Sequence, residues 1–469
     1  MRFDGNMLYC PAKEMVILLF ERKIYKELLA WKEEAHGEKA LLIEGARRIG
    51  KSTIVEEFGK REYRSYLLID FTIASSFVKN AFHNYLNDLD TFWMLIQSEY
   101  HTELFPRESL VIFDEIQKFP KAREAIKYLV KDGRYDFLET GSLISIHENV
   151  KDINIPSEER DIRMYPMDFE EFAAALGESQ LLRYIRSCFE KRIAPDEHMH
   201  QKAGLLFREY ILVGGMPKAV SKYLENGKSF RAADAEKRDI LMTYRNDIGK
   251  IEVPYRTKVL SIFDQIPAFL SQHEKRVRLK SVGGGEGIDY EETFFWLSDS
   301  MIVNECFNST DPNIGLSLNE DRTYIKCYLC DTGLLISHTF DESQLAEENL
   351  YLKILKNRLS VNKGMFFENV VAQCLSANGH KLYYYNHYSE ELHRNDMEMD
   401  FLIAEGSKIS GKLSAIEVKS SKNYTTTSLT AFLKQYGRKR IENAYVIHPK
   451  TYKEEDGITY LPAYMAFCL

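Results

Sequence analysis

GARRIGKS, residues 45–52, lies between a short apolar run and a segment with the apolar spacing of a helix. The apolar run, ALLI at residues 40–43, predicts a buried strand, and STIVEEF, which begins at Ser52, predicts a helix. The string fits the pattern G-x-x-x-x-G-K-S/T, in which the glycines let the backbone curl so that N–H groups point at a phosphate. The start of the helix adds positive potential there. Strand, turn and helix therefore predict a phosphate-binding loop.

Two side chains of this loop have predicted contacts with a nucleoside triphosphate and its Mg2+. Lys51 would reach the β- and γ-phosphates and assist catalysis, and the Ser52 hydroxyl would ligate Mg2+. We expect nucleotide contacts along the whole loop, from Gly45, Ala46, Arg47, Arg48, Ile49, Gly50, Lys51, Ser52 and Thr53.

A second apolar run ends in two acids that would complete this site. LVIF at residues 110–113 predicts a strand, and Asp114 and Glu115 follow it directly. Because the carboxyl ends of parallel strands meet at one edge of a sheet, both carboxylates should lie beside the loop. Asp114 would hold Mg2+ through water, and Glu115 would be the general base for the attacking water. An acidic pair favours hydrolysis of the nucleotide over binding alone.

Polar residues near the ends of other strands are further candidates for the same site. Thr140 and Ser142 follow a predicted strand, where a hydroxyl could contact the γ-phosphate or position water, and Asp70 could contact Mg2+ or a loop. Arg160 and Arg163 are candidates for an arginine finger, since a guanidinium neutralises charge on the phosphoryl group being transferred. The alternative for both arginines is a surface position.

Buried strands alternate with helices around these motifs, which predicts an α/β fold. We expect a parallel sheet with helices on both faces. The chain divides into an N-terminal helical segment, a nucleotide-binding domain, a helical lid or connector, a winged-helix-like region and a C-terminal α/β domain. The predicted boundaries of these five units are 1–36, 37–167, 168–250, 251–345 and 346–469.

Charge, cysteine spacing and hydropathy restrict the partners and the cellular compartment that we expect. With 62 basic and 70 acidic side chains the net charge is -8, so nucleic-acid binding would need a local basic surface. Seven scattered cysteines show no disulfide framework and indicate a reducing, cytoplasmic interior. Cys327 and Cys330 lack a second pair, which favours two buried thiols over a zinc site. The apolar stretch at residues 15–20 is too short to cross a bilayer, so we expect no membrane partner.

The C-terminal part contains a second set of acids. MFFENVVAQCL at residues 365–375 predicts a helix with Glu368 at the flank of its apolar stripe. Asp400 lies in a predicted strand, and Glu417 and Lys419 lie in the next. Because side chains alternate across a strand, Glu417 and Lys419 share one face of the sheet.

Active sites for metal-dependent phosphodiester hydrolysis combine carboxylates, which bind the metal ion, with a lysine on the same face of a sheet. We predict that Glu368, Asp400 and Glu417 ligate a second Mg2+ or a Mn2+, and that Asp400, Glu417 and Lys419 are catalytic. Lys419 would stabilise charge on the nucleophile or on the phosphorus. The alternatives are solvated strand ends, or a fold that binds nucleic acid or protein without cutting it.

On these motifs the chain resembles two known groups. ERKIYKELLAW, LLIEGARRIGKS, LVIFDEIQ, ETGSLIS and MYPMDFEEF, then YILVGGMP, YRND and DTGL, are similar to the large prokaryotic AAA-type ATPase family that carries a C-terminal domain of unknown function. This resemblance implies ATP as the nucleotide, and relatives often assemble as rings. Members usually have Gln where this chain has Arg48. The C-terminal acids with Lys419 resemble the PD-(D/E)xK restriction-endonuclease-like fold, although no Pro precedes Asp400.

Together these features predict an ATP-hydrolysing protein that controls a C-terminal nuclease-like domain, with DNA as its expected target. The alternative is an ATP-switched interaction protein, whose C-terminal fold binds nucleic acid or a protein partner without cleaving it. Retention of all four C-terminal residues favours the first interpretation, because a pure binding module gains little from keeping like charges close together.

Overall fold

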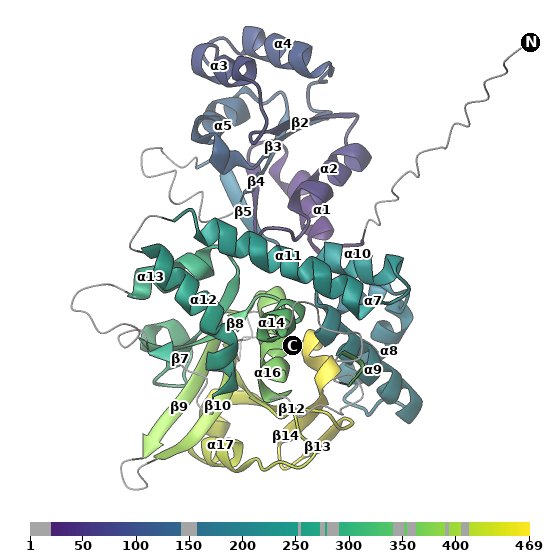
Figure 1. Cartoon of the computed structure of the whole chain (residues 1–469), viewed down its shortest axis with the longest axis vertical. Helices are drawn as coiled ribbons and strands as arrows, with labels where there is room; N and C mark the ends of the chain where they lie inside the picture. Colours follow the sequence, from purple (N-terminus) through teal and green to yellow (C-terminus); the bar gives the residue numbers. More distant parts are fainter. Residues whose placement is uncertain are drawn as a thin grey trace, which may run out of the picture.

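The computed structural model describes residues 20–141, 157–251, 255–272, 277–278, 290–340, 351–353, 363–389, 394–404 and 412–469. Ser142, the glycine cluster at 283–287 and the acidic segment at 341–349 lie outside these ranges. Two sheets organise the described residues, and the long helix α11 (Phe230–Ile248) crosses between them (Figure 1). No helix in these ranges is long and apolar enough to cross a membrane.

The first sheet is parallel throughout, as the sequence predicts. Its strand order is β2-β3-β4-β1-β5. The apolar runs of the sequence form its three central strands, which are buried along their whole length. The five strands are β1 (Ala40–Glu44), β2 (Ser65–Asp70), β3 (Ser109–Asp114), β4 (Asp136–Gly141) and β5 (Glu159–Arg163).

Helices cover both faces of this sheet, which confirms the predicted layers. Alternate residues of β1 enter different cores: Leu41 and Ile43 pack with α1 (Ile24–Ala35) and α2 (Lys51–Glu62), whereas Leu42 packs on the opposite face. That opposite face carries α3 (Ser76–Asn84), α4 (Leu89–Tyr100) and α5 (Pro120–Asp132), with the short 3-10 helix η1 (Ile116–Lys118) before α5.

The segment predicted as a helical lid or connector is indeed helical. Side-chain caps fix several of its helix starts: Asp168 forms a capping box with Glu171, and Asp196 and Ser229 accept N–H bonds at the starts of later helices. Its helices are α7 (Phe169–Ala175), α8 (Ser179–Glu190), α9 (Glu197–Val213), α10 (Pro217–Glu225) and α11.

The second sheet spans the predicted boundary between a winged-helix-like region and the C-terminal domain. Its order is β13-β14-β12-β11-β10-β9-β7-β8-β6, so strands from before and after residue 346 belong to one sheet. The join is the parallel pairing of β7 (Val303–Ser309) with β9 (Leu382–Ser389). Local apolar patterns do not report a pairing between segments this far apart in the chain, so the sequence did not reveal that these strands share one sheet.

The remaining elements complete this mixed sheet and its helical cover. β10 pairs antiparallel with β9 and β11, whereas β11, β12 and β14 run parallel. The strands are β6 (Val277–Arg278), β8 (Glu320–Leu329), β10 (Arg394–Ala404), β11 (Leu413–Val418), β12 (Ile441–His448), β13 (Lys453–Glu455) and β14 (Ile458–Pro462). The helices are α12 (Tyr255–Ser271), α13 (Tyr290–Asp299), η2 (Leu316–Asn319), α14 (Thr332–Thr339), α16 (Lys363–Ala377), α17 (Thr427–Arg440) and η3 (Ala463–Cys468).

Candidate functional site

The phosphate-binding loop is curled in the conformation that its glycines permit. Gly50, which precedes α2, has φ 94°, a left-handed value that side chains rarely adopt. The buried Lys51 ammonium donates to the carbonyl oxygens of Gly45 (2.8 Å) and Ala46 (2.9 Å), across the concave side of the loop. Burial lowers the pKa of Lys51 to about 8, although Glu115 and Asp114 oppose this effect.

The structure brings the predicted acids and hydroxyls together at the carboxyl edge of the first sheet. Ser52 Oγ donates to Asp114 Oδ1 at 2.9 Å, and the Thr140 hydroxyl donates to the same oxygen. Glu115 follows in a left-handed conformation, φ 54°, and its N–H donates to Thr140 Oγ1 at 3.3 Å. Asp70 ends the neighbouring strand, with Asp70 paired in register with Asp114.

These groups fit a magnesium nucleotide. A hydroxyl and a carboxylate oxygen lie beside an ammonium that can turn toward phosphate, and hard oxygens are the ligands that Mg2+ prefers. Burial raises the pKa of Asp114, while its bonds from Thr140 and Ser52 lower it. A nearby cation would therefore replace the hydroxyl donors as the stabiliser of this carboxylate.

A cavity of about 520 Å3 opens on the loop, within the size range of small-molecule sites. Its wall combines the loop with residues from the N-terminal segment, α10 and α11. Cations outnumber the single carboxylate, Glu115, as an anionic ligand requires. The lining residues are Phe20, Arg22, Arg47, Arg48, Gly50, Lys51, Ser52, Thr53, Ile54, Glu115, Pro217, Lys218, Ser221 and Thr243.

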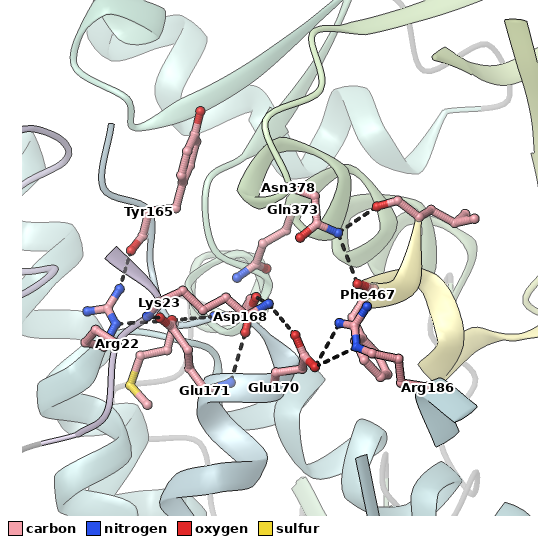
Figure 2. Close-up of polar contacts among 12 residues, drawn as sticks. Arg22, Lys23, Tyr165, Asp168, Glu170, Glu171, Arg186, Gln373, Asn378 and Phe467 are labelled. Atoms are coloured by element: carbon pink, nitrogen blue, oxygen red, sulfur yellow. Dashed lines mark hydrogen bonds and ion pairs between the residues drawn. The ribbon is translucent and has the colours of Figure 1, made fainter. Parts of the chain in front are cut away.

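Arg22 is a residue of this cavity that the sequence did not single out. Its guanidinium donates to the carbonyl oxygens of Ile49 in the loop (2.8 Å) and Tyr165 (2.6 Å), and its Nε lies 3.1 Å from Glu171. Figure 2 shows Arg22 between the Tyr165 backbone and the start of α7, next to Lys23. The only sequence signal was its place in the run ERKIYKELLAW, whose role spacing alone does not reveal.

The arginine-finger candidates do not reach this cavity. Arg160 forms an exposed pair with Glu34 at 3.0 Å, and Arg163 lies at the end of β5 beside Tyr165. Arg47, by contrast, pairs with Asp247 of α11 at 2.6 Å, and its carbonyl accepts the Tyr244 hydroxyl at 3.0 Å. Two residues of the string YRND, Tyr244 and Asp247, thus hold the loop against the predicted lid.

The C-terminal acids also converge, but around a lysine that the sequence did not reveal. Lys326 of β8 is fully buried, and its Nζ lies 3.4 Å from Glu368, 3.4 Å from Glu398 and 3.6 Å from Asp400. Burial alone would lower the pKa of Lys326, but these three carboxylates raise it well above its usual value. An available signal was a single lysine inside an apolar strand, RTYIKCYLC.

The predicted Glu417 and Lys419 lie next to this cluster. Lys419 Nζ is 2.6 Å from Glu417 Oε1, and Asp400 Oδ2 accepts the Val418 N–H at 2.7 Å. Burial raises the pKa of Glu417 to about 7, with Lys419 opposing it and Asp400 adding to it. Among the described residues, Glu417 Oε2 is buried without a hydrogen-bond partner.

A divalent cation does not fit this arrangement of Glu368, Asp400 and Glu417. The Lys326 ammonium already neutralises two of these carboxylates from inside the cluster. Within the described ranges, no group of three or more His, Cys, Asp or Glu side chains is placed to hold a metal ion. Two of the three predicted metal ligands, Glu368 and Asp400, therefore surround the Lys326 ammonium, and Glu417 pairs with Lys419 instead.

Comparison with known proteins identifies the first domain. Residues 37–173 match the model of an AAA domain family, and residues 204–344 and 363–465 match two domains of unknown function, DUF8612 and DUF4143. No curated protein matches the chain. Residues 37–173 are thus an AAA-type P-loop ATPase domain.

Solved structures offer only distant likenesses. A Walker-type ATPase of Pyrococcus abyssi is 16% identical over 68% of this chain and 96% of its own, with a TM-score of 0.38. The ADP complex of Hsp104 from S. cerevisiae is 10% identical over 77% and 44%, with a TM-score of 0.28. AMPPCP-bound DnaA from Aquifex aeolicus is 11% identical over 72% and 95%, with a TM-score of 0.23. At these scores the likenesses carry no argument about function.

Proposed function

We propose that this protein binds ATP with Mg2+ in the cavity above residues 45–52 and hydrolyses it. The observation that carries the proposal is the junction of Lys51, Ser52 and Asp114, where an ammonium, a hydroxyl and a carboxylate meet beside a curled loop. The Lys51 ammonium leaves its two carbonyl partners and contacts the β- and γ-phosphates. Mg2+, when bound, neutralises charge on the phosphates.

In this proposal Glu115 acts on the attacking water and Thr140 positions Asp114. Glu115 follows Asp114 at the strand end and lines the cavity, so its carboxylate can accept the proton of the water. The Thr140 hydroxyl, which now donates to Asp114, holds that carboxylate in place. Ser142, which lies outside the described residues, remains a sequence prediction for contact with the γ-phosphate or positioning of water.

The test measures nucleotide binding and turnover separately. Lys51→Ala should abolish the rise in melting temperature that Mg-ATP causes, and Glu115→Gln should keep this rise but slow ATP hydrolysis. Lys60→Ala is the control, since Lys60 lies on the same helix in a solvent-exposed pair with Glu56. If Lys51→Ala retains the full Mg-ATP shift, the loop is not the nucleotide site.

We further propose that the nucleotide state reaches the C-terminal domain through α11. One end of this helix holds the loop through the bonds of Asp247 and Tyr244 to Arg47. Nearer its start, the buried Asp234 accepts the hydroxyls of Ser337 in α14 (2.6 Å) and Tyr351. A movement of the loop on binding phosphate therefore pulls on a helix that is also bonded to Ser337 of α14 and to Tyr351.

For the C-terminal domain we propose binding of nucleic acid, with DNA favoured, without cleavage in the arrangement described. The observation behind this choice is Lys326, because a buried ammonium occupies the centre of the carboxylates that a nuclease uses for its metal. Cutting remains the second candidate, since the Glu417 and Lys419 pair of such nucleases is present.

We also propose a cytoplasmic location, where thiols stay reduced. Free thiols of the described residues support it, at Cys188, Cys306, Cys327, Cys330, Cys374 and Cys468.

DNA cleavage assays separate the two candidates. Single- and double-stranded DNA is incubated with the full chain, Mg2+ or Mn2+, and with or without ATP. Intact DNA under all conditions supports the binding module. Cleavage by the wild type that Lys419→Ala cannot perform establishes the nuclease instead.

A further inference from the structure

A second cavity, of about 1030 Å3, lies beside the Glu417 and Lys419 pair and has no assigned role. It is bounded by α9, the first residues of α16, and the segments that follow β11, β12 and β14. The residues that line it are Glu197, His200, Gln201, Gly204, Leu205, Phe207, Arg208, Lys363, Gly364, Phe367, Ser420, Ser421, Lys422, Pro449, Pro462, Ala463 and Tyr464.

The topology makes this place a ligand site. β11, β12 and β14 are neighbouring parallel strands, so their carboxyl ends open at one edge of the sheet. Ser420, Pro449 and Pro462 stand at those three ends and all line the cavity. Ligands of open α/β sheets bind outside the carboxyl ends of parallel strands, where backbone N–H groups and loop side chains are available.

The charges of the wall select an anion. Arg208, Lys363 and Lys422 line the cavity with one acid, Glu197, whereas burial lowers the pKa of His200 and leaves its ring uncharged near neutral pH. Arg208 is only partly exposed, and its Nε is buried without a hydrogen-bond partner among the described residues. Burial lowers the pKa of Arg208, and no carboxylate offsets this effect. A guanidinium kept partly buried without an acid is suited to a ligand that brings its own negative charge.

The apolar side chains in the wall and the volume of the cavity restrict the class of ligand further. Leu205 is exposed, and Phe367 is partly exposed, so the cavity offers apolar surface next to its cations. Base stacking on an aromatic side chain, here Phe367, beside a basic groove is how proteins hold single-stranded nucleic acids without reading their sequence. The volume is about twice that of the 520 Å3 cavity that we assign to one nucleotide, so two linked nucleotides fit.

We propose that this cavity binds a phosphodiester segment of a single nucleic-acid strand, with Arg208 and Lys422 on its phosphates. The inference rests on the nucleic-acid part of the proposed function and gives it a location. His200 donates or accepts a bond with the Tyr464 hydroxyl at 2.8 Å, which fixes its ring at the rim. Ser420 and Ser421 add hydroxyl donors between the cavity and Lys419.

The experiment measures binding of a fluorescein-labelled single-stranded DNA of about 12 nucleotides to the full chain by anisotropy. The test variant is Arg208→Gln with Lys422→Gln. The control is Arg183→Gln with Lys191→Gln, which removes the same two charges from exposed positions on and just after α8. Lys422→Gln alone is measured too, because Lys422 is exposed and its loss does not threaten folding.

We expect the double variant to lose about tenfold or more in affinity at low salt, and the control to lose much less. The slope of log affinity against log salt concentration should fall by about 1.4, since each phosphate contact on a single strand contributes about 0.7. Lys422→Gln should show about half of that change in slope. The Mg-ATP melting shift of every variant should equal that of the wild type, which shows that the fold is intact.

Other outcomes overturn the proposal in distinguishable ways. Equal affinity of wild type and double variant for DNA places nucleic-acid binding elsewhere, and the proposed function stands. If the wild type does not bind DNA, both this proposal and the nucleic-acid part of the proposed function are wrong. If inorganic phosphate or AMP raises the melting temperature of the wild type but not of the double variant, while DNA does not bind, the cavity holds a small phosphate compound instead.

Discussion

Lys326→Met removes the ammonium at the centre of the C-terminal carboxylates while keeping a long unbranched side chain. In the wild type this fully buried nitrogen lies within 3.4–3.6 Å of three carboxylates. Breaking a buried ion pair from one side costs about 3–5 kcal/mol, because the remaining charges are left uncompensated. At about 2–4 °C per kcal/mol, we expect the melting temperature to fall on the order of 10 °C.

As placed around the ammonium these acids form no metal site, and we expect the same substitution to let them close on a cation. Without the ammonium, Glu368, Glu398 and Asp400 present the oxygen donors that divalent cations prefer. A cation that binds only the folded state at about 100 times its Kd stabilises by about 2.7 kcal/mol. Mn2+ should therefore restore several degrees to the nucleotide-free variant and much less to the nucleotide-free wild type.

Differential scanning fluorimetry with EDTA or Mn2+ measures both effects. Lys381→Met is the matched control, because Lys381 is exposed at the start of β9 and pairs with Glu320 at 3.0 Å, where loss costs about 1 kcal/mol or less. The reasoning is refuted if Lys326→Met is no less stable than this control, or if Mn2+ stabilises wild type and variant equally.

Three other predictions concern the ATPase half of the chain. Burial raises the pKa of Glu44 to about 7 from 4.5, so native Glu44 keeps its proton more tightly than the unfolded chain and stability falls as pH rises from 4.5 to 7. Glu44→Gln should remove this dependence and add up to about 3 kcal/mol at pH 8 in urea unfolding, and an unchanged pH profile would contradict it. Because the pKa of Lys51 is about 8, Mg-ATP affinity measured calorimetrically should fall above pH 8 by up to about tenfold per pH unit, and constant affinity between pH 7 and 9 would argue against an ammonium–phosphate contact. Gly215→Ala places a methyl group 1.9 Å from the Met167 carbonyl oxygen and should cost about 1–3 kcal/mol, whereas Gly204→Ala, in open space on α9, should gain up to about 1 kcal/mol, and similar melting temperatures for the two would refute this.

The nucleotide site was predictable because its geometry is mostly local. The spacing of Gly45, Gly50 and Lys51 fixes one turn, and the rule that parallel strands end at one edge brings Asp114 to it without knowledge of strand order. Arg22 was not predictable, since its contact with the Ile49 carbonyl depends on how the N-terminal segment crosses the loop. The exposed position of Arg160 beside Glu34 likewise depends on tertiary structure, because its charge alone fits either role.

The second site was predictable only in part. Alternation along β11 places Glu417 and Lys419 on one face, and the structure pairs them. The position of Lys326 among the acids could not be predicted from the sequence. It depends on the pairing of β8 with β7 and on the parallel pairing of β7 with β9, which joins segments far apart in the chain. The alternation of Lys326 and Tyr328, both bonded to Glu368, is readable in the sequence once the partner strand is known.

The pairing of β7 with β9 also decides what any shortened version of this protein can report. A fragment that starts at residue 346 would lack β7 and β8, and the loss of β7 would leave β9 as a bare edge, open to pairing with other chains. It would also contain Glu368, Glu398 and Asp400 without Lys326. These carboxylates would then carry uncompensated negative charge and would bind a metal ion more readily than in the full chain. Nuclease activity found in such a fragment would therefore be a result of the truncation and would not show that the full chain cleaves DNA.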